Sequence, residues 1–277
     1  MKAMTQTLTL IGFGEAGSTF ARAAGWEDDA RAFDIRPVDF DAAAVRGCAS
    51  LADALAGTPS VISVVTADNA LSVAQDAAAL IAPGTFFFDM NSVAPGTKRA
   101  AAAAIGAAGA VYIDVAVMAP VNPSRLATPL LLSGPDAETG GAVLAALGFT
   151  NLRIVGDDVG RASTIKMLRS VMVKGVEALT AECLIACECA GVTDEVLGSF
   201  EGDWATGADY RIDRMLVHGG RRAAEMAEVV KTLAALGIEP LMTRGTVARQ
   251  AQLGGLGIAA PPAGLEAKLA KVRNAGQ

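Results

Sequence analysis

The chain has 277 residues, of which 52% are hydrophobic, and its formal net charge at pH 7 is −6. A chain of this length buries a large apolar core without covalent or metal cross-links, so we expect one large or two medium-sized globular domains. Four cysteines, a single histidine and the lack of a C-x-x-C pair exclude a disulfide framework and give no reason to expect a bound metal. The acidic charge, without a basic cluster, excludes nucleic acid as the expected partner and favours a small molecule.

No apolar run reaches the roughly 18 residues needed to span a membrane, and the apolar stretch near residue 10 is too short for a signal peptide. We therefore expect no membrane association. The few, scattered cysteines fit a reducing compartment, so a cytoplasmic protein is expected.

Short β-rich runs alternate with alanine-rich helical stretches from residue 6 to about residue 156. The β-rich runs cover residues 7–13, 30–35, 60–66, 84–90, 110–117, 129–134 and 152–156. This alternation is typical of βαβ units and predicts a mostly parallel sheet with helices on both faces. The predicted fold class is an α/β Rossmann-type N-terminal domain followed by an all-α C-terminal domain.

A single helix of roughly 30 residues is predicted over residues 160–191, where the β-rich runs have stopped. Its apolar residues recur at helical spacing, at Met167, Leu168, Val171, Met172, Val176 and Leu179. Lys166, Ser170 and Lys174 are spaced by four residues and therefore share another face. A helix this long and this apolar must cover several faces, which predicts at least a homodimer.

The domain boundary is placed near residue 157, with a dinucleotide-binding domain over 1–157 and a helical substrate and dimerisation domain over 158–277. Further helical pattern follows, and "GGLGIAAPPAGL" near residue 260 predicts a loop between the last helices. The stretch "LVHGGRRAAEM", which carries His218, Arg221 and Arg222, is expected to start a new helix.

A glycine-rich loop follows the first β-rich run directly, with G-x-G-x-x-G formed by Gly12, Gly14 and Gly17. The first glycine permits a sharp turn, the second lets a pyrophosphate approach the backbone, and the third lets the helix pack against the sheet. A dinucleotide-binding loop is expected, and a plain turn is the alternative. Phe13, Glu15 and Ala16 lie between the glycines and belong to the same expected cofactor site.

Asp34 ends the second β-rich run and matches the acidic residue that accepts hydrogen bonds from the adenosine ribose hydroxyls. A carboxylate there repels a 2′-phosphate, whereas Arg36, two residues on, could pair with one. Ile35, between them, offers no charge. NAD(H) is therefore expected to be preferred over NADP(H). The expected cofactor site is completed by residues after the later β-rich runs, namely Val65, Thr66 and Asn91.

Four stretches, in the correct order, resemble the β-hydroxyacid dehydrogenase family, which includes 3-hydroxyisobutyrate and 6-phosphogluconate dehydrogenases. "GFGEAG" resembles the family's cofactor loop, and "DMNSVAPGT" at 89–97 is similar to its D-x-S-T-x-x-P segment. "YIDVAVMAPV" at 112–121 takes the place of D-A-P-V-S-G-G, and "GRASTIK" resembles the G-x-G-x-x-x-K segment that carries a catalytic lysine. The helical half looks like an uncharacterised bacterial branch related to 6-phosphogluconate dehydrogenase.

The resemblance implies that Lys166 is the catalytic lysine and that Ser92, Met118 and Ala119 lie at the substrate site. Met118, Ala119 and Pro120 stand where the family has Ser-Gly-Gly, so substrate recognition must differ. Ser170 stands where the family usually has asparagine and is expected to join Lys166 in catalysis. Lys174 is expected to bind an anionic group of the substrate. For Ser170 and Lys174 the alternative is plain surface.

An alcohol that gives up a hydride must also lose a proton from its oxygen, which needs a base within hydrogen-bond reach. With Lys166 as that general acid and base, the expected enzyme is an NAD(P)-dependent dehydrogenase. Its expected substrate is a small, anionic hydroxy acid or the keto or semialdehyde counterpart. The alternatives are an imine reductase, a phosphosugar-acid dehydrogenase and a catalytically silent NAD(H)-binding sensor.

His218, Arg221 and Arg222 have two interpretations. The first is structural, with the histidine satisfied inside the protein and the arginines on a solvated face. The second is functional, with one arginine binding a substrate carboxylate or phosphate through both of its guanidinium nitrogens.

Overall fold

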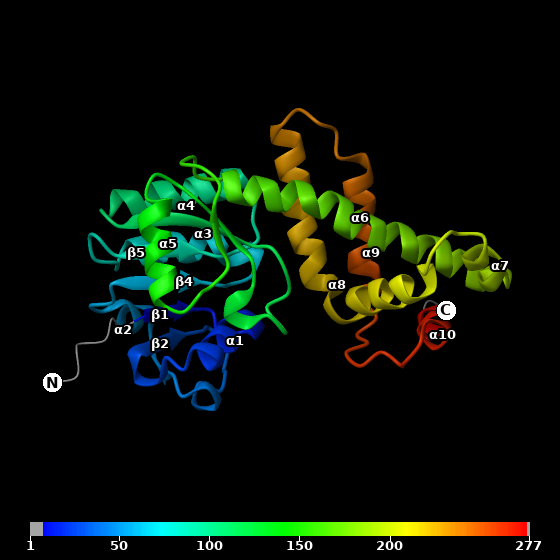
Figure 1. Ribbon diagram of the computed structural model, residues 1–277, viewed down its shortest axis with the longest axis horizontal. Helices are drawn as coiled ribbons and strands as arrows, with labels where there is room; N and C mark the ends of the chain where they lie inside the picture. The colour runs from blue at the N-terminus through cyan, green and yellow to red at the C-terminus, as the bar shows by residue number, and fades with distance from the viewer. Residues whose placement is uncertain (1–7, 276–277) are drawn as a thin grey trace. The chain divides into compact units, whose positions relative to one another are not determined.

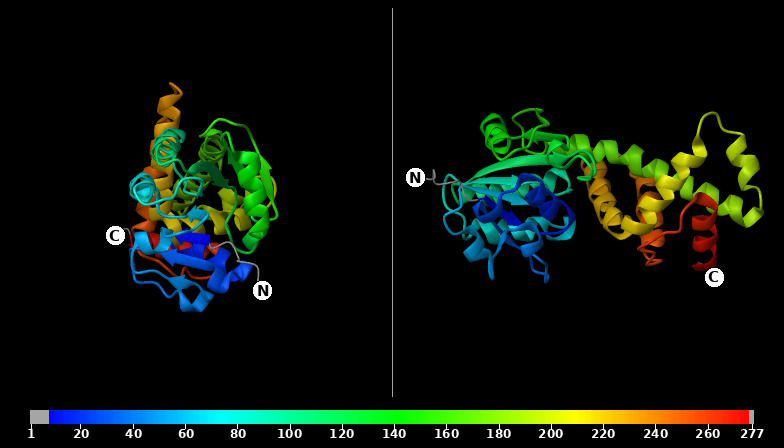
Figure 2. Two further views of the ribbon diagram at one scale, coloured as in Figure 1. Left: turned by 90° about the vertical axis from the view of Figure 1, so that its left-hand side faces the viewer. Right: turned by 60° about the horizontal axis from the view of Figure 1, so that its bottom comes forward.

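The computed structural model describes residues 8–275 (Figures 1 and 2). It divides into two compact units, Met1–Met167 and Leu168–Gln277. The division falls inside helix α6 (Arg161–Ala190), later than the expected boundary near residue 157. The reason is that Ala162, in the first turn of α6, is buried with Ala116 and Leu131 of the sheet.

The first unit is built on one eight-stranded sheet with the strand order β3-β2-β1-β4-β5-β6-β7-β8. The strands are β1 (Leu8–Ile11), β2 (Ala30–Phe33), β3 (Arg46–Gly47), β4 (Ser60–Ser63), β5 (Phe86–Asp89), β6 (Val111–Val117), β7 (Leu130–Ser133) and β8 (Leu152–Ile154). Strand β7 runs antiparallel to β6, and the other pairs are parallel. The expected mostly parallel sheet is confirmed.

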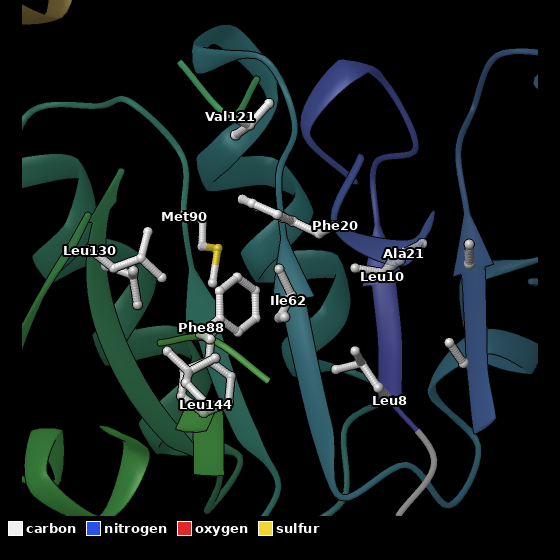
Figure 3. Close-up of a cluster of buried hydrophobic side chains, with 14 of the residues drawn as sticks. Leu8, Leu10, Phe20, Ala21, Ile62, Phe88, Met90, Val121, Leu130 and Leu144 are labelled. Carbon is white, nitrogen blue, oxygen red and sulfur yellow. The ribbon is translucent and has the colours of Figure 1, made fainter. Parts of the chain in front are cut away.

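Helices cover both faces of this sheet (Figure 1). They are α1 (Glu15–Ala24) and α5 (Ala137–Ala146) over one face, and α2 (Leu51–Leu55), α3 (Ala70–Ala78) and α4 (Pro95–Ala107) over the other. Short 3-10 turns lie at Glu27–Asp29, Asp41–Ala43, Ala67–Asn69 and Arg125–Ala127. Figure 3 shows the core under α1 and α5, where Phe20, Phe88 and Leu144 are fully buried between helix and sheet.

The second unit is helical, as expected. It contains the part of α6 after Met167, together with α7 (Thr193–Gly198), α8 (Trp204–Ala235), α9 (Leu241–Gly254) and α10 (Leu265–Ala275). Its core joins four of these helices through Ala181, Ile212, Met215, Leu216, Leu253 and Val272. The chain between α9 and α10 is a loop, as predicted from the glycines and prolines near residue 260.

The expectation that "LVHGGRRAAEM" starts a helix is wrong, because this stretch lies in the middle of α8. Its first glycine, Gly219, serves a close crossing of two helices and does not mark a break. A Cβ on Gly219 would lie 2.4 Å from the carbonyl oxygen of Gln250, and one on Gly254 would lie 2.3 Å from the amide nitrogen of Gly220. Helices α8 and α9 therefore touch backbone to backbone at this point.

In the second unit, the residues of α6 do not follow the usual pattern of buried apolar and exposed polar side chains. Ser170 and Lys174 are both buried, which rules out plain surface for them. The apolar Met172 and Leu179 are instead 67% and 61% exposed. Lys174 can be buried because Glu225 of α8 pairs with its ammonium.

Candidate active site

The glycine loop follows β1 and leads into α1. Gly12 has φ +93°, and a Cβ there would lie 2.6 Å from the carbonyl oxygen of Val64, so only glycine fits. A Cβ on Gly17 would lie 2.4 Å from the Gly12 carbonyl oxygen, which enforces the tight packing of helix on turn. By contrast, a Cβ on Gly14 would meet only Arg36, at 3.5 Å. The backbone at Gly14 is therefore open, as a pyrophosphate-binding turn requires.

Asp34 comes directly after β2 and faces the glycine loop. Its Oδ2 accepts a hydrogen bond of 2.8 Å from the Phe13 amide, and its Oδ1 accepts one of 2.9 Å from the Arg36 amide. The Arg36 guanidinium pairs with the same carboxylate, with Nε 3.2 Å from Oδ1. Burial opposes ionisation of Asp34, but the hydrogen bonds from Arg36 and Phe13 outweigh it and lower the pKa. Asp34 is therefore a carboxylate at neutral pH.

Asn91 holds the turn after β4 in place beside the glycine loop. Its Oδ1 accepts a hydrogen bond of 2.6 Å from the Val65 amide, and its Nδ2 donates to the Ser63 hydroxyl at 3.0 Å. Thr66, next in the chain, accepts a hydrogen bond of 2.9 Å from the Asn69 side chain. The carboxyl ends of β1, β4 and β5 thus bring the expected cofactor residues together, at the edge where parallel sheets bind ligands.

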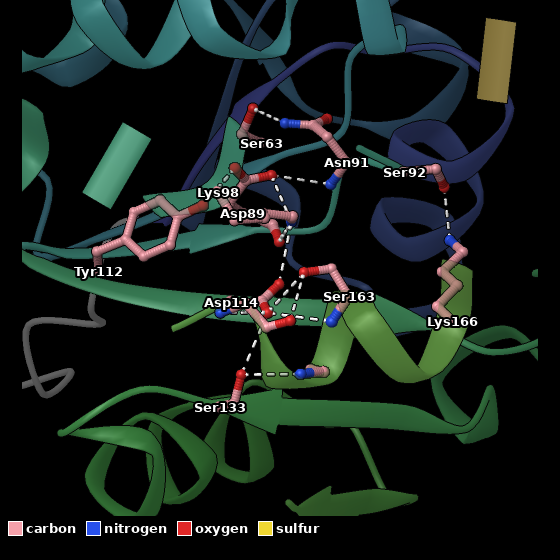
Figure 4. A network of polar contacts seen from close by, with 12 residues as sticks. Ser63, Asp89, Asn91, Ser92, Lys98, Tyr112, Asp114, Ser133, Ser163 and Lys166 are labelled. Carbon is pink, nitrogen blue, oxygen red and sulfur yellow. Dashed lines mark hydrogen bonds and ion pairs between the residues drawn. The ribbon is translucent and has the colours of Figure 1, made fainter. Parts of the chain in front are cut away.

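Ser92 and Lys166 meet at this edge (Figure 4). The Lys166 ammonium donates a hydrogen bond of 2.5 Å to the Ser92 hydroxyl, across 74 residues of sequence. Ser92 lies in the turn between β5 and α4, and Lys166 lies in the second turn of α6. Both side chains are half-buried. A cation and a hydroxyl in direct contact form a group that can hold or pass a proton at a ligand oxygen.

The start of α6 is fixed by side chains of the sheet. The Oδ2 atom of Asp114, on β6, accepts hydrogen bonds from the Gly160 amide at 3.1 Å and from the Ser163 amide at 3.1 Å. The Ser163 hydroxyl donates to the same oxygen at 2.9 Å. Ser133, on β7, accepts a hydrogen bond of 3.0 Å from the Ala162 amide and donates to Asp114 at 3.1 Å. These bonds satisfy amides that every helix start leaves without an intrahelical partner.

Lys98 of α4 is fully buried and links the end of β5 to β6 through two carboxylates (Figure 4). Its Nζ lies 2.9 Å from Asp89 Oδ1 and 3.4 Å from Asp114 Oδ1. Asp89 in turn accepts a hydrogen bond of 2.9 Å from the Asn91 amide. Burial, with the charges of Asp89 and Asp114, raises the pKa of Tyr112 well above its ordinary value, so its hydroxyl stays protonated and donates to Asp89 at 2.6 Å.

This buried network was missed at the level of sequence. The available signal was a single charged residue inside each continuous apolar β-run, in "FFFDM" and "VYIDVAV". A charge in a fully buried strand needs a partner, because unpaired burial of an ion costs several kcal/mol. Lys98 gave no comparable signal, since a lysine in an alanine-rich helix is usually solvated.

Met118 and Ala119 follow β6, half-buried. The Met118 side chain packs against the cluster that contains Ala116, Leu131 and Ala162, and its amide donates to the Pro129 carbonyl at 2.9 Å. Ile35 is 79% exposed beside the Asp34–Arg36 pair. The positions of Met118 and Ala119 do not test whether they contact a substrate, so their substrate role stays a prediction.

The second unit pairs the cations that were candidates for a substrate anion. Lys174 donates to Glu225 at 2.5 Å, and burial lowers the pKa of Lys174. The buried Arg222 pairs with Glu177, which also accepts a hydrogen bond of 3.0 Å from Gln250. Arg221 Nε lies 4.0 Å from Glu225. His218 is half-buried in the middle of α8.

Within residues 8–275, no cluster of three or more histidine, cysteine or acidic side chains has the arrangement of a metal site. Over the same range, no helix is both long and apolar enough to cross a bilayer.

Two family models match the chain, one in each unit. Residues 7–148, just over half of the sequence, match the NAD binding domain of 6-phosphogluconate dehydrogenase, and residues 188–253 match a domain of unknown function, DUF1932. A conserved hypothetical protein from Sinorhizobium meliloti is 34% identical. The match covers 99% of this chain and 98% of that one, with a TM-score of 0.71.

More distant solved structures share the fold. The 3-hydroxyisobutyrate dehydrogenase of Mycobacterium tuberculosis is 18% identical, with 98% of this chain and 99% of that chain covered and a TM-score of 0.71. An imine reductase from Pseudomonas sp. is 17% identical, with 97% and 99% covered and a TM-score of 0.58. Fold and glycine loop together define an NAD(P)-binding dehydrogenase or reductase. The chain belongs to the β-hydroxyacid dehydrogenase family.

Proposed function

We propose that this oxidoreductase acts on the CH–OH group of a small, anionic hydroxy acid, or on its keto or semialdehyde counterpart, with Lys166 as general acid and base. The observation that carries the proposal is the contact of 2.5 Å between Lys166 and Ser92, at the carboxyl edge of the sheet beside Asn91. A solvated surface lysine would not be held against a hydroxyl at this edge.

The residues of the site fit a nicotinamide dinucleotide. The open backbone at Gly14, with its neighbours Gly12 and Gly17 packed tightly, leaves room for a pyrophosphate. When bound, the nicotinamide supplies or accepts the hydride. Lys166 takes the hydroxyl proton in the oxidative direction as a neutral amine, and as an ammonium it donates to the developing alkoxide in the reductive direction. The Ser92 hydroxyl orients Lys166 and can share the same proton.

The cations of the second unit are paired with acidic side chains, and this favours a small carboxylate substrate over a phosphosugar acid. A phosphate would need several free cations, but Lys174 and Arg222 are paired with Glu225 and Glu177. Arg221 also lies against Glu225. An imine reductase and a silent NAD(H)-binding sensor are disfavoured by Lys166, which neither would need in this position. The proposed roles of Ser170 and Lys174, to bind a substrate hydroxyl and an anionic group, follow from their spacing of four residues after Lys166 on one helix face. Lys174 would have to exchange Glu225 for the substrate anion.

The proposed cofactor preference is NAD(H) over NADP(H). Asp34 is ionised at neutral pH and repels a 2′-phosphate. Arg36 could attract that phosphate only by leaving the carboxylate it pairs with. Because the Arg36 side chain is 64% exposed, this pair is worth at most about 1 kcal/mol, so the expected preference is modest.

A homodimer is proposed for the exposed apolar side of α6. Leu168, Met172 and Leu179 lie at helical spacing on it, with exposed fractions of 40%, 67% and 61%. An apolar helix side of this kind loses free energy to water unless another surface covers it. A second copy of the chain offers the same stripe, which satisfies the self-complementarity of a two-fold interface.

The function is tested by hydride-transfer assays over hydroxy acids, keto acids, aldehydes and cyclic imines, each with NADH, NADPH and the oxidised forms. We expect turnover with a hydroxy acid or its counterpart and loss of that turnover in Lys166→Ala. Turnover confined to cyclic imines, or undiminished in Lys166→Ala, would overturn the proposal.

A further inference from the structure

A hollow of about 610 Å³ lies in the first unit, between α4, the turn at 156–160 and the start of α6. Two arginines line it, Arg99 from α4 and Arg161 from the first turn of α6, together with Asp158 and Thr164. Two guanidinium groups therefore line one hollow, although the net charge of the chain is −6. Their mutual repulsion is relieved when an anion lies between them.

Two glycines make room for these arginines. A Cβ on Gly160 would lie 2.8 Å from Arg99 Nη1, and one on Gly156 would lie 2.7 Å from Arg161 Cδ. Both glycines also have positive φ, +99° and +141°. Each arginine side chain therefore packs against the backbone of one short turn. A side chain at either glycine would displace the arginine that packs there.

Neither guanidinium forms an ion pair or a hydrogen bond with any residue of the range 8–275, although Asp158 borders the same hollow. The helix start adds little here, because the amides of Gly160, Ala162 and Ser163 already donate to Asp114 and Ser133. The attraction for an anion thus comes from the two side chains.

The hollow is separate from the contact between Lys166 and Ser92. Thr164, which lines the hollow, lies two residues before Lys166, and residues two apart on a helix do not share a face. One residue before Thr164, the Ser163 hydroxyl donates a hydrogen bond to Asp114 of the sheet.

We propose that this hollow binds a phosphate ester, with Arg99 and Arg161 gripping the phosphate from two sides. A dianion balances the two guanidiniums, and the planar forks of arginine match phosphate oxygens through paired hydrogen bonds. The volume falls within the range of small-molecule sites and exceeds what a phosphate group alone fills, so the rest of a small metabolite fits beside it. This binding does not depend on the proposed reaction.

The test uses the full chain and inorganic phosphate as the probe, with phosphorus NMR line broadening and thermal unfolding at constant ionic strength. We expect saturable binding in the wild type, weakened about tenfold or more in Arg99→Ala and in Arg161→Ala, because each removes charged hydrogen bonds. Arg99→Lys, which keeps the charge but loses the fork, should fall between. Absence of saturable binding in the wild type would overturn the proposal.

Two matched controls locate the bound phosphate. Arg153→Ala removes an exposed arginine of β8 outside the hollow and should leave phosphate binding unchanged. Arg36→Ala removes the guanidinium beside the glycine loop and should also leave it unchanged. Binding that is lost in Arg36→Ala and kept in Arg99→Ala would place the phosphate at the glycine loop and refute the hollow as its site. Far-ultraviolet circular dichroism checks that each variant is folded.

Discussion

The carboxylate of Asp114, on the buried strand β6, accepts hydrogen bonds from both the amide and the hydroxyl of Ser163. Lys166 lies three residues further along the same helix, so the sheet sets where that lysine stands. We expect Asp114→Ala to lower the free energy of unfolding by about 3–5 kcal/mol, since it breaks a buried pair with Lys98 and leaves helix amides without acceptors. Urea unfolding measures this loss.

Asp114→Asn keeps an acceptor oxygen and should fold. It should lower kcat while leaving the Kd of the cofactor unchanged, and it should shift the pH profile of kcat, because the charge beside the helix start is gone. The control is Thr85→Ala, a buried hydroxyl that donates to the Thr58 carbonyl and costs about 1 kcal/mol. If Thr85→Ala lowers kcat as much as Asp114→Asn, Asp114 has no positioning role.

Lys166→Ala should lower turnover by about 10²- to 10⁴-fold, the range for loss of a general acid or base. Lys166→Arg should be nearly as damaging, because a guanidinium keeps its proton at working pH. Cofactor affinity, measured by NADH fluorescence titration, should stay nearly unchanged in both variants. Lys271→Ala, on the exposed side of α10, is the control. A variant that loses NADH binding together with turnover would make Lys166 a structural or cofactor-contacting residue.

Cofactor preference should follow the Asp34–Arg36 pair. We expect wild-type protein to bind NADH more tightly than NADPH, and Asp34→Ala to reduce or reverse that difference by removing the repulsion of the 2′-phosphate. Arg36→Ala should widen it, since the guanidinium that pairs with Asp34 is then lost. Parallel titrations with both cofactors measure these ratios. Tighter NADPH binding by the wild type would show that Arg36 outweighs Asp34.

The same pair predicts a pH dependence of stability. The pKa of Asp34 is lower in the folded protein than in the unfolded chain, so its contribution is present above about pH 4 and is lost as the pH falls through the folded value. The difference in unfolding free energy between wild type and Arg36→Ala should therefore shrink below pH 4. Urea unfolding at pH 7 and pH 3 compares them, and a difference that grows on acidification would contradict the sign.

The apolar side of α6 should set the oligomeric state. Met172→Glu and Leu179→Glu place charges on the exposed stripe and should shift a dimer toward monomers of 28.1 kDa. Leu80→Glu, at an exposed apolar position in the first unit, should leave the mass unchanged. Light scattering at micromolar concentration gives the mass. A monodisperse monomer in the wild type would refute the dimer.

The sheet could be predicted from sequence because its strands are continuous apolar runs, and the long α6 because its pattern is uninterrupted. Strand β3 was missed, since two residues, Arg46 and Gly47, carry no β-pattern. The stretch around Gly219 and Gly220 was expected to start a helix because, in the sequence, glycines at a backbone contact between helices look the same as glycines at a helix break.

The candidate site divides in the same way. Short motifs with fixed spacing were enough to select five of its residues as candidates, namely Gly12, Gly14, Gly17, Asp34 and Lys166. The Lys98 network and the burial of Ser170 could not be predicted, because they depend on which distant residues face them. Lys174 needed α8 in place before its partner Glu225 was known.

One consequence of the Lys166–Ser92 contact concerns the cost of ordering a flexible side chain. A free lysine loses about 1.5–2 kcal/mol of rotamer freedom when it is fixed in one conformation. Here that loss has already occurred during folding, because the half-buried Ser92 holds the Lys166 ammonium at 2.5 Å. A ligand oxygen that binds at this edge meets an ammonium that is already ordered. Less of the binding free energy is then lost to ordering the lysine, and more of it can contribute to the difference in affinity between substrates.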